Sequence, residues 1–161
     1  MQPPTRKAEI LDQIRATHRP LDAALNQLDP DRMCEPGVNG EWSVKDMLAH
    51  ITWWEQHLLR RLRTGRDDLD DLYVEGVDDR SVTDRANADV FVANRDRPLA
   101  EVRADFDASY REVLAVIEAM ADDVLATDDV YEGISWDTFR HYPAHTTMLT
   151  TWLESSTHGG A

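Results

Sequence analysis

Apolar residues recur every three or four positions in four stretches of the chain, the period of one face of an α-helix. The stretches span residues 5–28, 43–64, 98–120 and 135–153. A shorter helical segment is expected at 84–94, between the second and third stretches. We find neither the strict alternation of a β-strand nor a hairpin signal. The pattern predicts an all-α fold, a four-helix bundle with a short extra helix in the crossover.

The second helix has the best marked start. Ser43 is followed three residues later by Asp46, which is close to a capping box and predicts a helix that begins at Val44. Arginines in the last turn, followed by Gly65, predict where this helix ends. His50 lies inside the apolar stripe of the helix. Its side chain should therefore point toward the protein interior rather than toward water.

Prolines fall inside two of the predicted helices. Pro20 should kink the first helix or restart it near Arg19, because proline removes a backbone hydrogen bond and clashes with the carbonyl four residues earlier. Ser135 or Asp137 can cap the fourth helix. Pro143 follows within that helix, so we expect its start to be irregular.

The composition narrows the class of protein. At 161 residues the chain is expected to form one domain, 1–161, around a single core. Its 17 basic and 31 acidic side chains give a net charge of -14, which disfavours binding to a phosphate backbone. Cys34 is the sole cysteine, as suits a reducing compartment. Because we find no apolar signal core and no membrane-spanning run, we expect a cytoplasmic protein with neither a nucleic-acid nor a membrane partner.

Three histidines could form a metal centre. His141 and His145 are four residues apart, so on a helix they share one face and could hold one ion. His50, from the buried stripe of another helix, would complete three nitrogen ligands and leave positions for water or substrate. Zinc, nickel and ferrous iron all accept imidazole. The alternative is half-buried histidines bonded to carboxylates or carbonyls, with no metal. His57, nearer the helix end, is the weaker candidate.

Side chains near these histidines are candidates for catalysis and substrate binding. Glu55 could orient a histidine or act as a general base, the alternative being an exposed helix carboxylate. Tyr142 could donate a proton. Aromatic residues at the mouth of a bundle either pack in the core and rim or line a pocket for a flat organic ligand. The expected substrate-binding residues are Trp53, Trp54, Asn87, Tyr110 and Trp136.

Three segments carry a resemblance to a known family: residues 40–50 (GEWSVKDMLAH) with Trp54-Glu55, residues 87–99 (NADVFVANRDRPL) and residues 141–145 (HYPAH). In them the chain resembles the ClbS/DfsB branch of the DinB-like superfamily of four-helix bundles. The resemblance implies an up-up-down-down bundle, frequently a homodimer, with a histidine triad at one end that often holds a divalent metal.

The residues that match this triad are His50, His141 and His145, so the cofactor is expected to be zinc or nickel, unless the site is metal-free. One departure from the family is the doubled Trp53-Trp54, which would narrow the pocket.

The resemblance also implies what such a site does, namely detoxification or self-resistance. Our first hypothesis is a hydrolase that opens an electrophilic ring, such as a cyclopropane in a toxic metabolite. Its catalytic residues would be the three histidines with Glu55 and Tyr142. The second is a metal-dependent thiol transferase, with Arg60, Arg61 and Arg63 as a basic entrance for an anionic thiol. The third is a non-catalytic protein that sequesters its ligand.

Overall fold

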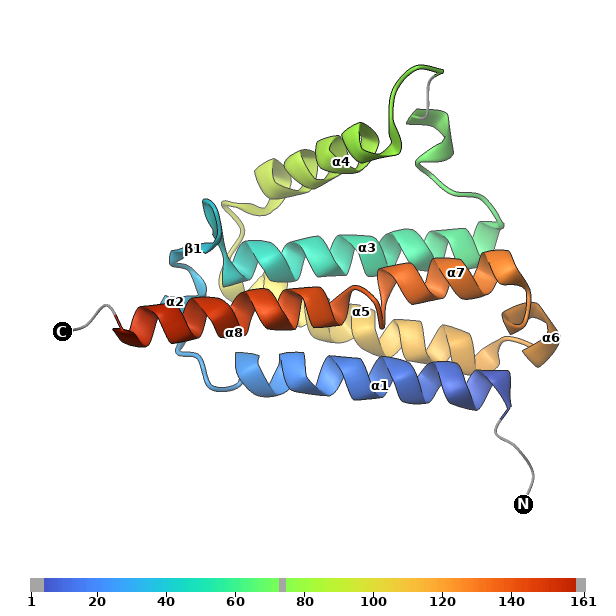
Figure 1. The fold of residues 1–161 in the computed structure, drawn as a ribbon, viewed down its shortest axis with the longest axis horizontal. Helices are drawn as coiled ribbons and strands as arrows, with labels where there is room; N and C mark the ends of the chain where they lie inside the picture. Colours follow the sequence, from blue (N-terminus) through green and yellow to red (C-terminus); the bar gives the residue numbers. More distant parts are fainter. Residues whose placement is uncertain (1–4, 73–74, 159–161) are drawn as a thin grey trace.

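The computed structural model describes residues 5–72 and 75–158, and its long helices form one bundle (Figure 1). Three bundle members are α1 (Arg6–Leu25), α3 (Val44–Thr64) and α5 (Leu99–Ala119). The fourth consists of two helices in succession, α7 (Asp128–Asp137) and α8 (Tyr142–His158). α3 and α5 run in one direction, and α1 and the α7–α8 pair run in the other (Figure 1). The predicted all-α four-helix bundle is confirmed, but its members run up-down-down-up rather than in the up-up-down-down order that the resemblance implies, because the α4 crossover returns the chain to the end where α3 begins.

Two helix pairs enclose the core, because α3 packs along α5 and α1 packs along α8. The facing sides of these helices carry fully buried apolar side chains, among them Ile14, Leu21, Leu48, Ile51, Phe106, Val113 and Ile117. Burying one such side chain contributes about 1.5–3 kcal/mol, so this layer fixes how the four members lie against one another. Short elements connect them: α2 (Pro30–Met33), η1 (Asp70–Leu72) and α6 (Asp122–Leu125). None of the described helices is long and apolar enough to cross a membrane.

The start of α3 is a complete capping box, as the sequence predicts. The Ser43 Oγ accepts the Asp46 backbone N–H at 3.2 Å, and the Asp46 Oδ2 accepts the Ser43 N–H at 2.8 Å. The helix ends at Gly65, which has a φ of 68°. Before it, β1 (Pro36–Asn39) pairs antiparallel with β2 (Trp42–Ser43). The sequence showed no sign of this pair, because strands this short carry no alternating pattern.

The extra helix in the crossover is longer than predicted. α4 (Asp79–Asn94) begins five residues before the expected 84–94 segment, because the Asp78 side chain accepts the Ser81 N–H at 2.8 Å and caps it. α4 packs on α3 and lies outside the bundle (Figure 1). Leu69, Val82 and Ala86 form a small apolar cluster beneath it. The crossover thus forms a layer over one side of α3.

Pro20 does not interrupt α1, so the predicted restart near Arg19 is wrong. Pro20 itself is exposed, whereas Leu21 and Leu25 after it and Ile14 before it are fully buried. Burying both halves of the helix outweighs a penalty of about 3 kcal/mol for the internal proline.

The fourth bundle member is broken where the sequence predicts one helix. α7 contains Ser135 and Asp137, the two residues expected to cap that helix, and ends at Asp137. Thr138 then leaves the helical conformation, with φ -129° and ψ -98°. α8 starts at Tyr142, with Pro143 in its first turn, where a proline is tolerated. The break places His141 in the turn just before α8.

Candidate metal centre and adjoining cleft

Three histidines from different parts of the fold bring their ring nitrogens together. His50 lies on α3, His141 in the turn before α8, and His145 in the first turn of α8. The His141 Nε2 is 3.0 Å from the His50 Nε2 and 2.9 Å from the His145 Nε2. One ligand atom from each ring lies within 4.8 Å of the other two. The predicted triad residues therefore meet, although His141 stands outside the helix that the spacing assumed.

All three rings are in the neutral form that binds metals. Burial lowers the pKa of His50 to about 3 and that of His141 to about 4, and it lowers the pKa of His145 well below its ordinary value. A neutral imidazole nitrogen has either one lone pair or one N–H, so the His141 Nε2 can form a straight hydrogen bond with only one of its two neighbours. A cation among the nitrogens would accept all three lone pairs. The donor set thus fits a divalent metal such as zinc or nickel.

The second ring nitrogen of each triad histidine, the Nδ1, bears on how firmly a metal would be held. The Nδ1 atoms of His50, His141 and His145 are buried and have no hydrogen-bond partner in the described parts of the chain. Metal-binding histidines usually donate this N–H to an oxygen, and losing that partner weakens metal binding by about 10–100-fold. We therefore expect a metal that exchanges rather than one that is retained through purification.

A cleft between α3, α4 and α7 opens beside the triad. One cavity of about 390 Å³ is lined by His50, Trp54, Thr83, Asn87, Trp136, Asp137 and His141. A neighbouring cavity of about 290 Å³ shares four of these side chains, those of Trp54, Thr83, Trp136 and Asp137. The Trp54 Nε1 donates to the Asn87 Oδ1 at 3.0 Å, which holds one aromatic wall in place. Trp136 is 63% exposed, so the opposite wall projects into solvent.

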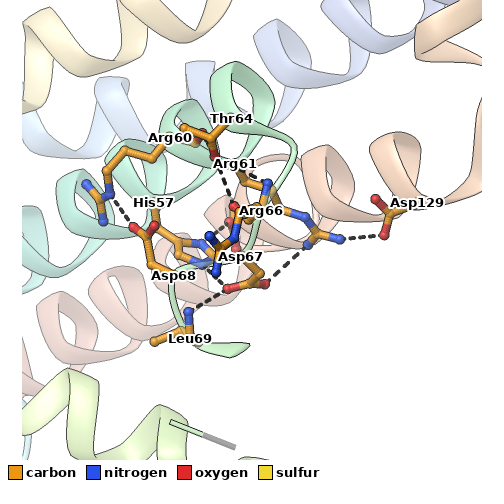
Figure 2. Close-up of polar contacts among 10 residues, drawn as sticks. His57, Arg60, Arg61, Thr64, Arg66, Asp67, Asp68, Leu69 and Asp129 are labelled. Carbon is orange, nitrogen blue, oxygen red and sulfur yellow. Dashed lines mark hydrogen bonds and ion pairs between the residues drawn. The ribbon is translucent and has the colours of Figure 1, made fainter. Parts of the chain in front are cut away.

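The second cavity contains a polar cluster that the sequence did not reveal. His57, only 3% exposed, has its Nδ1 3.0 Å from the Asp137 Oδ2 and its Nε2 2.8 Å from the Asp67 Oδ1. Figure 2 shows Asp67 contacting both His57 and Arg61, with Arg61 reaching on to Asp129. Burial alone would lower the pKa of His57, but the hydrogen bonds to the two carboxylates outweigh burial and raise it. This shift favours an imidazolium, which would donate to a carboxylate on each side and join α3 to α7.

One signal in the sequence could have pointed to this histidine. His57 follows His50 by seven residues, two helical turns, so both lie on the same face of α3. Its carboxylate partners carry no such signal, because Asp137 is 80 positions away and Asp67 belongs to an acidic run typical of a solvated loop.

Glu55 and Tyr142 form a buried pair in the core instead of lining the cleft. Glu55 is 0% exposed, so the exposed-carboxylate alternative is wrong. The Tyr142 hydroxyl donates to the Glu55 Oε1 at 2.6 Å. Burial raises the pKa of Glu55 to about 7, although the hydrogen bond from Tyr142 counteracts part of the shift. Within the described residues Glu55 makes no hydrogen bond to a histidine, so it orients none of them directly.

The predicted substrate-binding residues divide into two groups. Trp54, Asn87 and Trp136 line the cleft. Trp53 packs on Trp54 and lines a separate cavity under α4. Tyr110 stacks on His18 and lines a groove between α1 and α5. The adjacent tryptophans of α3 therefore face different cavities.

Known proteins share this fold and part of its sequence pattern. The family model of the DinB superfamily matches residues 13–147. Three solved structures cover 96% of this chain. An uncharacterised Escherichia coli UTI89 protein is 19% identical with a TM-score of 0.76 and 96% of its own chain covered. The colibactin self-resistance protein ClbS, in complex with a dsDNA, is 17% identical with a TM-score of 0.76 and 98% covered.

A third structure, the sibling lethal factor precursor DfsB, is 16% identical with a TM-score of 0.75, and 98% of that chain is covered. At these identities the likeness shows the fold alone. No protein with a curated description matches the chain by sequence. The family model spans most of the chain and includes all three triad histidines. The chain belongs to the DinB superfamily.

Proposed function

We propose that the protein is a self-resistance or detoxification hydrolase that holds a divalent metal between His50, His141 and His145. Its substrate would be an electrophilic small molecule bound in the adjoining cleft, such as an activated cyclopropane. One observation carries the proposal: three neutral imidazole nitrogens converge beside a cavity with aromatic walls. Three nitrogen ligands leave coordination positions open, as catalytic sites require. The fold shared with the self-resistance protein ClbS supports the same substrate class.

The chain's own residues would bind the substrate and move protons. Trp54 and Trp136 would contact a flat organic ligand from two sides, and the Asn87 amide would bind a polar group on it. A divalent metal at such a site lowers the pKa of a bound water and supplies a nucleophile near neutral pH. Asp137 lines the same cleft and shares a proton with His57 through its Oδ2. This pair takes the place of the predicted Glu55 and Tyr142 in our proposal.

Ring opening by water needs one group that accepts a proton from the water and one that donates a proton to the carbon released from the ring. The water oxygen forms a bond to one ring carbon, a carbon–carbon bond breaks, and its electron pair moves to the carbon beside an activating carbonyl. Water loses one proton and that carbon gains one, so the sum is the addition of one water. Asp137 can accept a proton, and the His57 imidazolium, 3.0 Å away, can replace one that Asp137 gives up.

The arginines expected at the entrance of a thiol transferase already have partners. Arg60, Arg61 and Arg63, proposed as an entrance for an anionic thiol, are already paired with acidic side chains. Arg60 pairs with Asp68 and Arg63 with Glu112. Breaking these pairs would offset part of the free energy gained by binding a thiolate.

A cytoplasmic location and a homodimer stay predictions from the sequence.

A ring-opening assay tests the proposal. Protein supplied with zinc or nickel is incubated with a carbonyl-activated cyclopropane in ¹⁸O-labelled water, and the product is analysed by mass spectrometry. We expect a product that has gained one labelled water, no product from His50→Ala/His145→Ala, and a rate about 10²–10⁴-fold lower for Asp137→Asn. Asp129→Asn, on the same helix, is the matched control and should keep the activity. Unchanged compound bound to wild-type protein would indicate sequestration, and a product formed only with added thiol would indicate a transferase.

A further inference from the structure

A groove of about 470 Å³ lies between α1 and α5 and shares no lining residue with the cleft beside the triad. Its α1 side carries Arg15, His18 and Arg19, and its α5 side carries Tyr110 and Arg111. Three arginines therefore line one groove of a chain whose net charge is -14, together with the carboxylates of Asp22 and Asp107.

His18 lines the groove between the arginines of α1, and its Nε2 has no hydrogen-bond partner among the described residues. Its ring is stacked on Tyr110, with ring centroids 3.6 Å apart, and is followed by Phe106 at 5.6 Å. The residue is 7% exposed, and its Nε2 is buried without a hydrogen bond to any described residue. A buried polar group without a partner costs about 1–3 kcal/mol.

The positive charge in the groove is only partly neutralised. Arg103 contacts the two carboxylates that also line it, with its Nη2 3.3 Å from Asp22 and its Nε 3.4 Å from Asp107. Arg15 pairs with Glu118 at 3.0 Å.

Arg19 and Arg111 are different, because neither forms an ion pair or side-chain hydrogen bond with any residue in 5–72 or 75–158. The chain has 31 acidic side chains and 17 basic ones, so a lack of carboxylates in the sequence does not explain why these two arginines have no ion-pair partner in the described parts of the chain.

We propose that this groove binds a small ligand bearing an oxyanion, a phosphate or a carboxylate, between Arg19 and Arg111 and above His18. A guanidinium presents paired N–H donors that match the oxygens of both anions. The ring of His18 and the hydroxyl of Tyr110 would add polar contacts. A groove of this volume fits a small ligand, whereas the negative charge of the whole molecule repels a polyanion.

Nuclear magnetic resonance of the histidine rings tests this directly. Inorganic phosphate and acetate are titrated into ¹⁵N-labelled protein at constant pH and ionic strength, with chloride as the reference salt. We expect a saturable shift of the His18 ring signals with phosphate, acetate or both. Arg19→Ala/Arg111→Ala should weaken binding by about tenfold or more, because charge-assisted hydrogen bonds are lost. Arg80→Ala/Arg85→Ala, which removes two arginines of α4 that form no ion pair with a described residue either, should leave binding unchanged.

Three results would overturn the proposal. One is the absence of any saturable shift at His18 beyond that caused by chloride, and another is an equal loss of binding in both double variants. The third concerns the source of the phosphate, since ClbS has been solved with dsDNA. If a short DNA duplex binds through Arg19 and Arg111 while phosphate and acetate do not, the groove recognises a polyanion rather than a small ligand. Because these residues lie outside the cleft, each outcome is independent of the hydrolase assay.

Discussion

The free energy of unfolding of a Glu55→Gln variant, compared with that of wild type, should rise as the pH increases. The Glu55 carboxylate is fully buried on α3 and accepts the Tyr142 hydroxyl at 2.6 Å. Its Oε2 has no hydrogen-bond partner among the described residues. Glutamine keeps the shape of the side chain and an oxygen for Tyr142 but cannot ionise. The substitution therefore removes the charge while preserving the packing.

The magnitude follows from the pKa of this group. Burial raises the pKa of Glu55 from 4.5 to about 7. The folded protein then binds more protons than the unfolded chain, so this group's stabilising contribution is complete below pH 4.5 and is lost as the pH rises through 7. A shift of that size corresponds to about 3 kcal/mol. Between pH 5 and 8, the free energy of unfolding of Glu55→Gln minus that of wild type should rise by about 2–3 kcal/mol.

Urea denaturation at several pH values measures this difference. Burying the glutamine amide changes the free energy of unfolding by the same amount at every pH. The test is therefore how the difference between variant and wild type changes with pH, not its absolute value. As a further check, Tyr142→Phe removes a hydrogen bond that favours the ionised form, and the slope in that variant should continue to higher pH. A difference between Glu55→Gln and wild type that is flat from pH 5 to 8 would refute the reasoning.

Three further predictions concern the frame of the site. Ser43→Ala should lower the free energy of unfolding by about 1 kcal/mol, because it removes the cap of α3; no change in urea midpoint would contradict this. His57→Asn should destabilise most below pH 6.5, where the imidazolium is fully charged, and the loss should shrink as the pH rises through its raised pKa; a pH-independent loss would exclude this charge effect. In a Glu55→Gln background, stability should fall as the pH drops from 6.5 toward 4, because His18 and His141 have pKa values of about 4; constant stability over that range would mean that these rings are not held neutral.

Local signals were sufficient for most of the bundle. The period of apolar residues predicted its four members, and Ser43 with Asp46 predicted the start of α3 to the residue. The same period placed His50 on the buried face. It also places Glu55 there, four residues after Ile51, although its charge left an exposed helix carboxylate as the alternative. Here the position on the helix was a better guide than the residue type.

Long-range contacts explain what local signals missed. Asp137 carries the signature of a helix cap, yet it ends α7 and bonds to His57 of α3, a contact that no local pattern encodes. The resulting break sets His141 in a turn, where it still meets His145. Tyr110 lies on a correctly predicted helix, but the helix pairing turns it toward α1 and His18. Which faces meet is decided by tertiary packing.

Metal binding by the triad is the most direct test of the account. Zinc and nickel are titrated into metal-free protein by calorimetry, which counts the bound metal at equilibrium. We predict close to one metal per chain for wild type and for His57→Asn, a control that alters a buried histidine outside the triad, and none for His50→Ala/His145→Ala. Wild-type protein that takes up neither metal, or a triad variant that binds as well as wild type, would contradict the account.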